Sequence, residues 1–289
     1  MGKFTQATTS EEIDADLAER YGDYAGFTTA ASPYLIEEYG EDPHGEVKRL
    51  LARSIRRDSR ILDIGCGPGH TLCRFAPEVD EAWGIDEDEA LLAGAKARVT
   101  ALGLSNVSLV HGNIEHETDV AQLPDDYFDI AYCESGPNLN TALARKLTND
   151  ALFLQEIGGH YSGYQLHEIM GRKPYTYYAY GDDYSDQILL SDMAALDLVP
   201  ISVKHYFYDW YFRDVEHLEA HVKQVVWQLG DWRMGGPLPY DPVRDRTALE
   251  LYARYNTTAK GIRMQEHLRV FAWRRARVHY YPAAPNFSP

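Results

Sequence analysis

The eight residues from Leu62 to Gly69 read LDIGCGPG and constrain the fold more than any other segment of the chain. Ile61, Leu62 and Ile64 form a short apolar run typical of a strand buried on both faces, and glycines at alternate positions follow it. Glycine removes the side chains that would keep a ligand away from the backbone. A helical pattern begins at His70. The segment therefore predicts a strand, a ligand-binding turn with free N–H groups, and a helix N-terminus.

The residues around the turn separate two classes of cofactor. A dinucleotide fingerprint needs a third glycine at position 70, where this chain has His70. Asp63 lies two residues before Gly65, where its carboxylate would repel a pyrophosphate and attract an ammonium group. The turn therefore favours a cofactor with a cationic amino-acid group over a dinucleotide.

Three later strands also end in polar residues. The apolar run 82–85 ends in Asp86, at the spacing where doubly wound nucleotide sites place a carboxylate for ribose hydroxyls. Asp86 is also suited to cap the helix predicted to begin near Glu87, and the two roles are compatible. Strand 107–110 runs into Asn113 and Ile114, and strand 128–133 ends in Glu134. We expect these residues to meet at one edge of a parallel sheet.

This order of strand ends resembles the class I S-adenosylmethionine (SAM) methyltransferases. The resemblance implies that the glycine turn lines the methionine part of SAM and that the acid before it faces the amino group. It also implies that residues after the third strand hold adenine, through a polar contact to its edge and an apolar one to its face. The cofactor-binding residues expected on these grounds are Asp63, Gly65, Cys66, Gly67, Gly69, Asp86, Glu87, Asn113, Ile114 and Glu134.

A closer resemblance joins residues 134–137, 153–160 and 211–215 to a little-characterised bacterial group of these enzymes, of small-molecule type. Members commonly carry Arg and His where this chain has Glu134 and Ser135. The resemblance therefore supports the lineage and does not transfer an acceptor.

Strands alternate with helical patterns from Arg60 to about Gly158, which predicts a parallel sheet with helices on both faces. The expected fold class is α/β, a doubly wound, seven-stranded, mostly parallel, Rossmann-like sheet with an α-helical cap. A short helical stretch is also expected around 33–39. The predicted organisation is an N-terminal lid segment (1–45), a SAM-binding core (46–213), a helical insert that forms the cap (214–262), the last strand of the core (263–278) and a tail (279–289).

The candidate catalytic residues are Glu134 and His160, which follow strands four and five, because methyl transfer to a hydroxyl or thiol needs a base. Either residue is also compatible with a structural role. Tyr175, Tyr178 and Tyr180 share a tyrosine-rich loop and are the candidate substrate-binding residues, since such rings bind aromatic or cationic molecules.

Composition bears on partners and location. Lys and Arg number 28 against 44 Asp and Glu, a net charge of −16, which disfavours nucleic acid as a partner. Three cysteines and the lack of a signal peptide or a long apolar run predict a cytoplasmic protein outside the membrane. His217 and His221 are one helical turn apart without the pattern of a zinc site, so no metal is expected.

The leading hypothesis is therefore a methyltransferase that moves a methyl group from SAM to a small-molecule acceptor, an amine or an aromatic compound, and leaves S-adenosylhomocysteine (SAH). Two alternatives stay open. One is a SAM-binding sensor or partner protein without catalysis, and the other is a methyltransferase acting on RNA or protein. The sequence leaves the oligomeric state undetermined.

Overall fold

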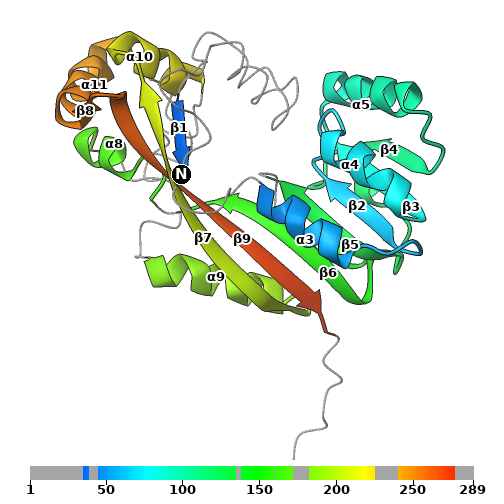
Figure 1. Ribbon diagram of the computed structural model, residues 1–289. Helices are drawn as coiled ribbons and strands as arrows, with labels where there is room; N and C mark the ends of the chain where they lie inside the picture. The colour runs from blue at the N-terminus through cyan, green and yellow to red at the C-terminus, as the bar shows by residue number, and fades with distance from the viewer. Residues whose placement is uncertain are drawn as a thin grey trace, which may run out of the picture.

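The computed structural model describes residues 35–38, 45–134, 138–159, 161–171, 182–224 and 240–276 (Figure 1). The strands are β1 (Leu35–Glu38), β2 (Arg60–Ile64), β3 (Glu81–Asp86), β4 (Val107–His111), β5 (Phe128–Glu134), β6 (Leu147–Gly158), β7 (Leu198–Phe212), β8 (Thr257–Thr258) and β9 (Gly261–Arg275). The helices are α3 (Glu46–Ser54), α4 (His70–Phe75), α5 (Glu89–Ala101), α6 (Glu117–Val120), α7 (Thr141–Ala144), α8 (Tyr164–Ile169), α9 (Asp182–Ala194), α10 (Val215–Gln224) and α11 (Pro242–Asn256), with a 3₁₀ turn at Ala76–Glu78.

The strands form one sheet in the order β1-β7-β9-β6-β5-β2-β3-β4, and β8 pairs with β9 outside this path. The strands β2 to β6 pair in parallel, whereas β9 runs antiparallel to both β6 and β7. The parallel strands therefore end at one edge of the sheet. The chain order reverses between β2 and β5, the kind of switch point where α/β sheets bind ligands.

Two hydrophobic cores cover the two faces of this sheet. One contains Val47 and Leu51 of α3 and Leu72 of α4, packed against strand residues such as Ile61 and Tyr132. The other gathers residues of α6, α7 and α9 against the alternate strand positions, among them Leu62, Ile64, Ala131, Cys133 and Phe153. Successive residues of a strand belong to different cores because their side chains point to opposite faces of the sheet. The predicted doubly wound, Rossmann-like α/β fold is confirmed.

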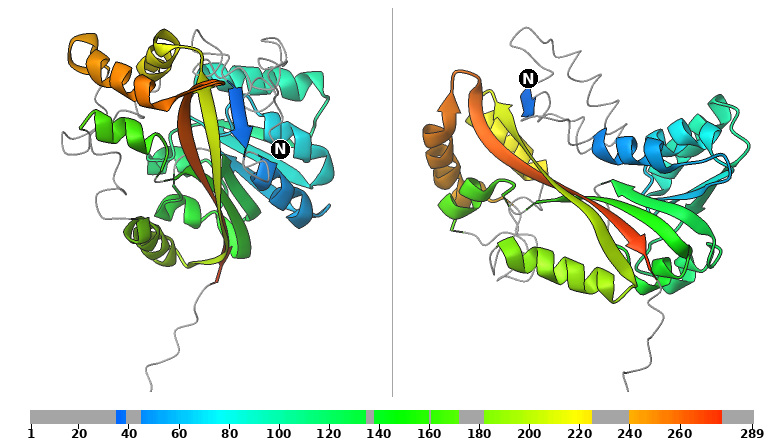
Figure 2. Two further views of the ribbon diagram at one scale, coloured as in Figure 1. Left: turned by 60° about the vertical axis from the view of Figure 1, so that its left-hand side comes forward. Right: turned by 60° about the horizontal axis from the view of Figure 1, so that its bottom comes forward.

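The strands β7 and β9 are longer than the others and pair along almost their whole length, from Leu198 to Phe212. In Figures 1 and 2 they extend beyond the core to a second group of helices, α8, α10 and α11. Leu218 and Val222 of α10 and Leu249 of α11 belong to the same hydrophobic core as α3 and α4. Leu218 and Val222 of α10, in the expected helical insert, thus pack inward.

Three expectations about secondary structure need correction. In the described part of the chain the sheet has nine strands rather than seven, because the edge strand β1 and the two-residue β8 join it. The helix expected around 33–39 is instead the strand β1, which pairs antiparallel with residues 208–211 of β7. An isolated helix as short as the one expected is marginal in water, whereas pairing with β7 satisfies the backbone groups of the strand. The last strand begins at Gly261, earlier than expected.

Within the described part of the chain, none of the helices combines the length and apolar composition required to cross a bilayer.

Candidate functional site

The glycine turn after β2 depends on backbone conformations that favour glycine. Gly65, Gly67 and Gly69 have φ angles of 73°, 50° and 72°, in the left-handed region that other residues rarely adopt. A side chain at Gly67 would project into open space, since no atom lies within 4 Å of its ideal Cβ position. The turn therefore leaves room for a ligand directly against the backbone.

The N–H groups of this turn are used inside the protein, contrary to the expectation that they point at a ligand. Those of Gly65 and Cys66 both donate to the carbonyl of Ile85, at 2.9 and 3.1 Å, and that of Gly69 donates to the carbonyl of Cys66 at 2.9 Å. The N–H of Gly67 donates to a carboxylate, as described next. A phosphate cradle needs free N–H groups. The geometry thus disfavours a pyrophosphate at this turn.

Asp86 joins the turn to the end of β3. Its Oδ2 accepts the N–H of Gly67 at 2.7 Å and its Oδ1 accepts the N–H of Asp88 at 2.9 Å. A carboxylate has about four lone-pair sites, so these bonds leave capacity for ribose hydroxyls. The proposed helix cap is a different residue: Asp88 accepts from Ala90 and Leu91 at the start of α5.

Cys66 is a packing residue within the turn. Its Sγ lies 2.7 Å from the position that a Cβ on Gly84 of β3 would take, so the thiol fills the space that this glycine leaves. Burial, and then the carboxylates of Asp63 and Asp86, raise the pKa of the Cys66 thiol. The thiol therefore stays protonated and is unsuited to act as a nucleophile.

The residues after β4 are brought to the same edge. The Asn113 side-chain amide donates to Oε2 of Glu87 at 2.6 Å, and its Oδ1 accepts the N–H of Glu115 at 2.8 Å. Ile114 is buried, and its carbonyl accepts from Asn140. Glu87 and Asn113 are thus in direct contact, which the sequence did not predict. Asn113 keeps one amide hydrogen beyond these bonds for another acceptor.

Asp63 is buried in the sheet beneath the turn, with an exposed fraction of 4%. The hydroxyl of Tyr132, on the neighbouring strand β5, donates to its Oδ2 at 2.9 Å. Burial, followed by the negative charge of Glu134, raises the pKa of Asp63 well above its usual value, although the hydrogen bond from Tyr132 lowers it. A cationic group placed here would favour the ionised carboxylate.

Glu134 ends β5 beside a second carboxylate, Glu156, with which it pairs in register on β6. Both side chains lie on the sheet face that carries α3, because each follows by two positions a residue of that hydrophobic core, Tyr132 or Leu154. Lys48 of α3 places its Nζ 3.5 Å from Oε2 of Glu134. Burial and the charge of Glu156 raise the pKa of Glu134, while Lys48 and the Thr71 hydroxyl lower it.

Sequence reasoning missed Tyr132, Glu156 and Lys48. A signal for Glu156 was present, because parallel pairing of the strands ending at 134 and 158 brings the two glutamates level. Tyr132 lies two residues before Glu134, on the same face of β5. Lys48 had no such signal, since its position depends on how α3 packs over the sheet.

Several predicted residues lie outside the described residues: His160, Ser135 and the substrate candidates Tyr175, Tyr178 and Tyr180. His217 and His221 lie within the described residues, and their imidazole rings pack against aromatic side chains of β7. His217 lies 5.3 Å from the Phe212 ring and His221 lies 5.0 Å from those of Trp210 and Phe212. The N–H of Arg213 donates to Nδ1 of His217.

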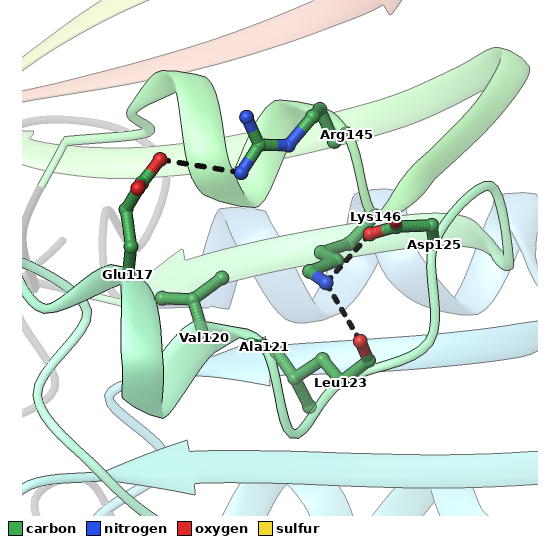
Figure 3. A pocket seen from close by; sticks show the side chains of 7 residues that line it. All are labelled: Glu117, Val120, Ala121, Leu123, Asp125, Arg145 and Lys146. Carbon is green, nitrogen blue, oxygen red and sulfur yellow. Dashed lines mark hydrogen bonds and ion pairs between the residues drawn. The ribbon is translucent and has the colours of Figure 1, made fainter.

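A cavity of about 340 Å³ lies away from these strand ends, among residues of α6 and the segments that lead into β5 and β6 (Figure 3). The buried ammonium of Lys146 donates to the carbonyl of Leu123 at 2.7 Å and to Asp125 at 2.6 Å. Arg145 pairs with Glu117 across its rim. These contacts tie two loops together and explain the polar lining without a ligand.

Residues 55–162 match the family model Methyltransf_31, described as a methyltransferase domain. The chain is 37% identical over 107 residues to the uncharacterized methyltransferase YcgJ of Bacillus subtilis, an alignment covering 37% of this chain and 41% of that protein. The chain thus spans less than half the length of the first curated relatives that it matches.

Two solved structures share the fold. A functionally unknown protein from Deinococcus radiodurans R1 has a TM-score of 0.56 at 18% identity, covering 90% of this chain and 98% of its own. The YcgJ protein of Bacillus subtilis has a TM-score of 0.53 at 17% identity, covering 81% and 99%.

Residues 55–162 therefore match a methyltransferase domain, which agrees with the class predicted from the glycine turn and the strand ends. The match agrees with the predicted class of enzyme, a methyltransferase.

Proposed function

We propose that this protein transfers a methyl group from SAM to a small-molecule acceptor. The observation that carries the proposal is the bond between Gly67 and Asp86, which fastens an open glycine turn to a carboxylate at the neighbouring strand end. Asp63 lies buried beneath the same turn. A turn without phosphate donors, flanked by two carboxylates, suits a cofactor that has an ammonium group and ribose hydroxyls but no phosphate.

The residues present fit SAM in three places. The space over Gly67 would take the methionine part, since a Cβ there meets no other atom. The carboxylate of Asp63 would face the amino group and that of Asp86 the ribose hydroxyls. Asn113 and Ile114 would contact the edge and face of the adenine, with Glu87 orienting Asn113 through their hydrogen bond.

When bound, SAM supplies an activated methyl group. The acceptor forms a bond to that methyl carbon as the carbon–sulfur bond breaks, and SAH is left with the sulfur electron pair. The protein has mainly to align the acceptor and exclude water. Few catalytic residues are needed for such a displacement.

The acceptor that we favour is an amine. Glu134 and Glu156 lie level on adjacent strands at the edge that carries Asp63 and Asp86, so this edge is rich in carboxylates. An ammonium-bearing molecule is attracted to such a site, and the net charge of −16 adds a long-range contribution. Tyr175, Tyr178 and Tyr180 remain our proposal for the side chains that contact the acceptor. An aromatic amine would pair its ammonium group with the carboxylates and pack its ring against the tyrosines.

In this proposal Glu134 attracts the protonated amine, which gives up one proton to solvent before transfer, so that the nitrogen lone pair can form the bond to the methyl carbon. Lys48 is the described cation nearest to its carboxylate, at 3.5 Å, and would be displaced or shifted as a cationic acceptor arrives. His160 remains the second candidate base. The organisation that we propose keeps an N-terminal lid (1–45) and the insert (214–262) as the parts that close over the acceptor, with the core (46–213, 263–278) holding SAM.

The test is incubation of the full chain with methyl-labelled SAM and a small-molecule metabolite fraction, followed by mass identification of labelled products. We expect a labelled product that forms with SAH in equal amounts. Binding of SAM without any labelled product would instead identify a SAM-binding protein that does not catalyse transfer. Labelling only after addition of RNA or protein would overturn the small-molecule acceptor.

A further inference from the structure

We infer that Tyr132 is a positioning residue for the cofactor, which holds the Asp63 carboxylate in place for the amino group of SAM. The inference rests on the proposed function, because it takes SAM as the ligand. It adds a residue to the site that neither the glycine motif nor the strand-end residues include.

The geometry comes from neighbouring strands. Tyr132 of β5 and Asp63 of β2 are level in the parallel pairing. The phenol hydroxyl donates to Oδ2 of Asp63 at 2.9 Å, and the exposed fractions are 0% for Tyr132 and 4% for Asp63. A buried hydrogen bond of this kind fixes the rotamer of the carboxylate, and it leaves Oδ1 for a ligand at the turn.

The charges around Asp63 make this bond important for ionisation. Glu134 on β5 and Asp86 on β3 are negative neighbours, whereas Lys48 on α3 is a positive one. The thiols of Cys66 in the turn and Cys73 on α4 also face it and stay neutral, because burial raises the pKa of each. Burial and Glu134 raise the pKa of Asp63, and the Tyr132 hydroxyl is the hydrogen-bond donor that opposes this shift.

Removal of the hydroxyl should therefore lower the affinity only for ligands that carry the amino group. In Tyr132→Phe the ring still fills its place in the core, but Asp63 loses its donor and its pKa rises further. A cationic ligand needs the ionised carboxylate, so SAM should bind more weakly over the pH range in which Asp63 titrates. The affinity should recover as the pH rises and the carboxylate ionises without help.

The experiment is calorimetric titration of wild type and Tyr132→Phe with three probes across a series of pH values. SAM and SAH carry the amino group, whereas 5′-methylthioadenosine lacks it and keeps the ribose and adenine. We expect Tyr132→Phe to bind SAM and SAH about tenfold or more weakly near neutral pH. We expect its affinity for methylthioadenosine to change less than twofold, and its SAM profile to shift upward by about one pH unit.

The double variant Asp63→Asn with Tyr132→Phe completes the test. If Tyr132 acts through the Asp63 charge, Tyr132→Phe adds little further loss of SAM affinity on the Asp63→Asn background. An equal loss for SAM and methylthioadenosine, or the same loss at every pH, would show a merely structural role and overturn the inference. Wild type that binds neither SAM nor SAH would overturn the proposed function instead.

A second measurement covers the case in which Tyr132→Phe fails to fold. Wild-type affinity for SAM should then rise with pH through the Asp63 transition, and Asp63→Asn should lose that dependence. Either a flat wild-type profile or an unchanged profile in Asp63→Asn would overturn the inference.

Discussion

The N–H of Gly67 and Oδ2 of Asp86 are joined by a hydrogen bond of 2.7 Å, which ties the glycine turn after β2 to the end of β3. The same carboxylate accepts the N–H of Asp88. One side chain thus fixes the turn and the start of the following segment, and in our proposal it also binds the ribose. Because of these two functions, we expect a substitution of Asp86 to lower cofactor affinity more than a substitution of any neighbouring carboxylate.

Asp86→Ala should weaken SAM binding by about ten- to a hundredfold, because a charged hydrogen-bond acceptor for the ribose and for Gly67 is lost. Calorimetry with SAM and SAH measures the change. Asp88→Ala is the matched control, since Asp88 caps α5 through Ala90 and Leu91. It should lower stability by about 1 kcal/mol and leave the affinity for SAM nearly intact. Similar losses of affinity in both variants would contradict the ribose role.

Asp63→Asn should make the ligand-free protein more stable at neutral pH while weakening SAM binding. The folded-state pKa of Asp63 is raised by burial and by Glu134, so its contribution to stability is present at low pH and is lost as the pH rises toward that pKa. A neutral amide removes this loss. Urea unfolding of both proteins from acidic to neutral pH measures the effect, and the advantage of the variant should grow with pH. An advantage that shrinks with rising pH would contradict this sign.

Gly84→Ala should damage the cofactor turn from the neighbouring strand. An added Cβ would lie 2.7 Å from Sγ of Cys66 and 2.9 Å from Cδ2 of Leu72, so the turn or α4 must shift. We expect a loss of stability of about 1–3 kcal/mol together with weaker SAM binding. Gly94→Ala is the control. Gly94 lies in helix α5, and a Cβ there would lie 3.6 Å from Cβ of Pro68, an ordinary van der Waals contact. It should stabilise the protein slightly, and a loss there would show that the region tolerates no added methyl group.

Glu134→Gln separates two roles of the carboxylate at the end of β5. If Glu134 acts as a base, the rate of methyl transfer should fall by about a hundredfold or more with both ligands still bound. If it only attracts a cationic acceptor, the loss should be in acceptor KM. We favour the second outcome and expect the same KM effect in Glu156→Gln. Exposed Glu117→Gln serves as the control. Single-turnover kinetics with unchanged rate and affinity in Glu134→Gln would remove this residue from the site.

Local sequence predicted the fold of the core and the residues of the candidate cofactor site. The apolar residues Ile61, Leu62 and Ile64 predicted a buried strand, and the glycines after them predicted a turn. The class of domain was predicted from this segment together with the polar residues at the later strand ends. Asp86, Asn113 and Glu134 followed as well, because parallel strands end at one edge whatever the details of packing. These features depend on interactions close in sequence or on the general geometry of a parallel sheet.

Tertiary structure alone decided the features that depend on contacts between distant segments. Tyr132 bonds to Asp63 across 69 positions, a pairing that requires the register of β2 with β5. The residues at 35–38 became a strand because β7 offered an open edge, against their local helical pattern. The sequence predicted free N–H groups in the glycine turn. In the fold, those of Gly65 and Cys66 donate to the carbonyl of Ile85, which β3 places beside the turn. Sequence patterns encode which face of an element is apolar, but the partner that meets each polar group is set only when the strands assemble.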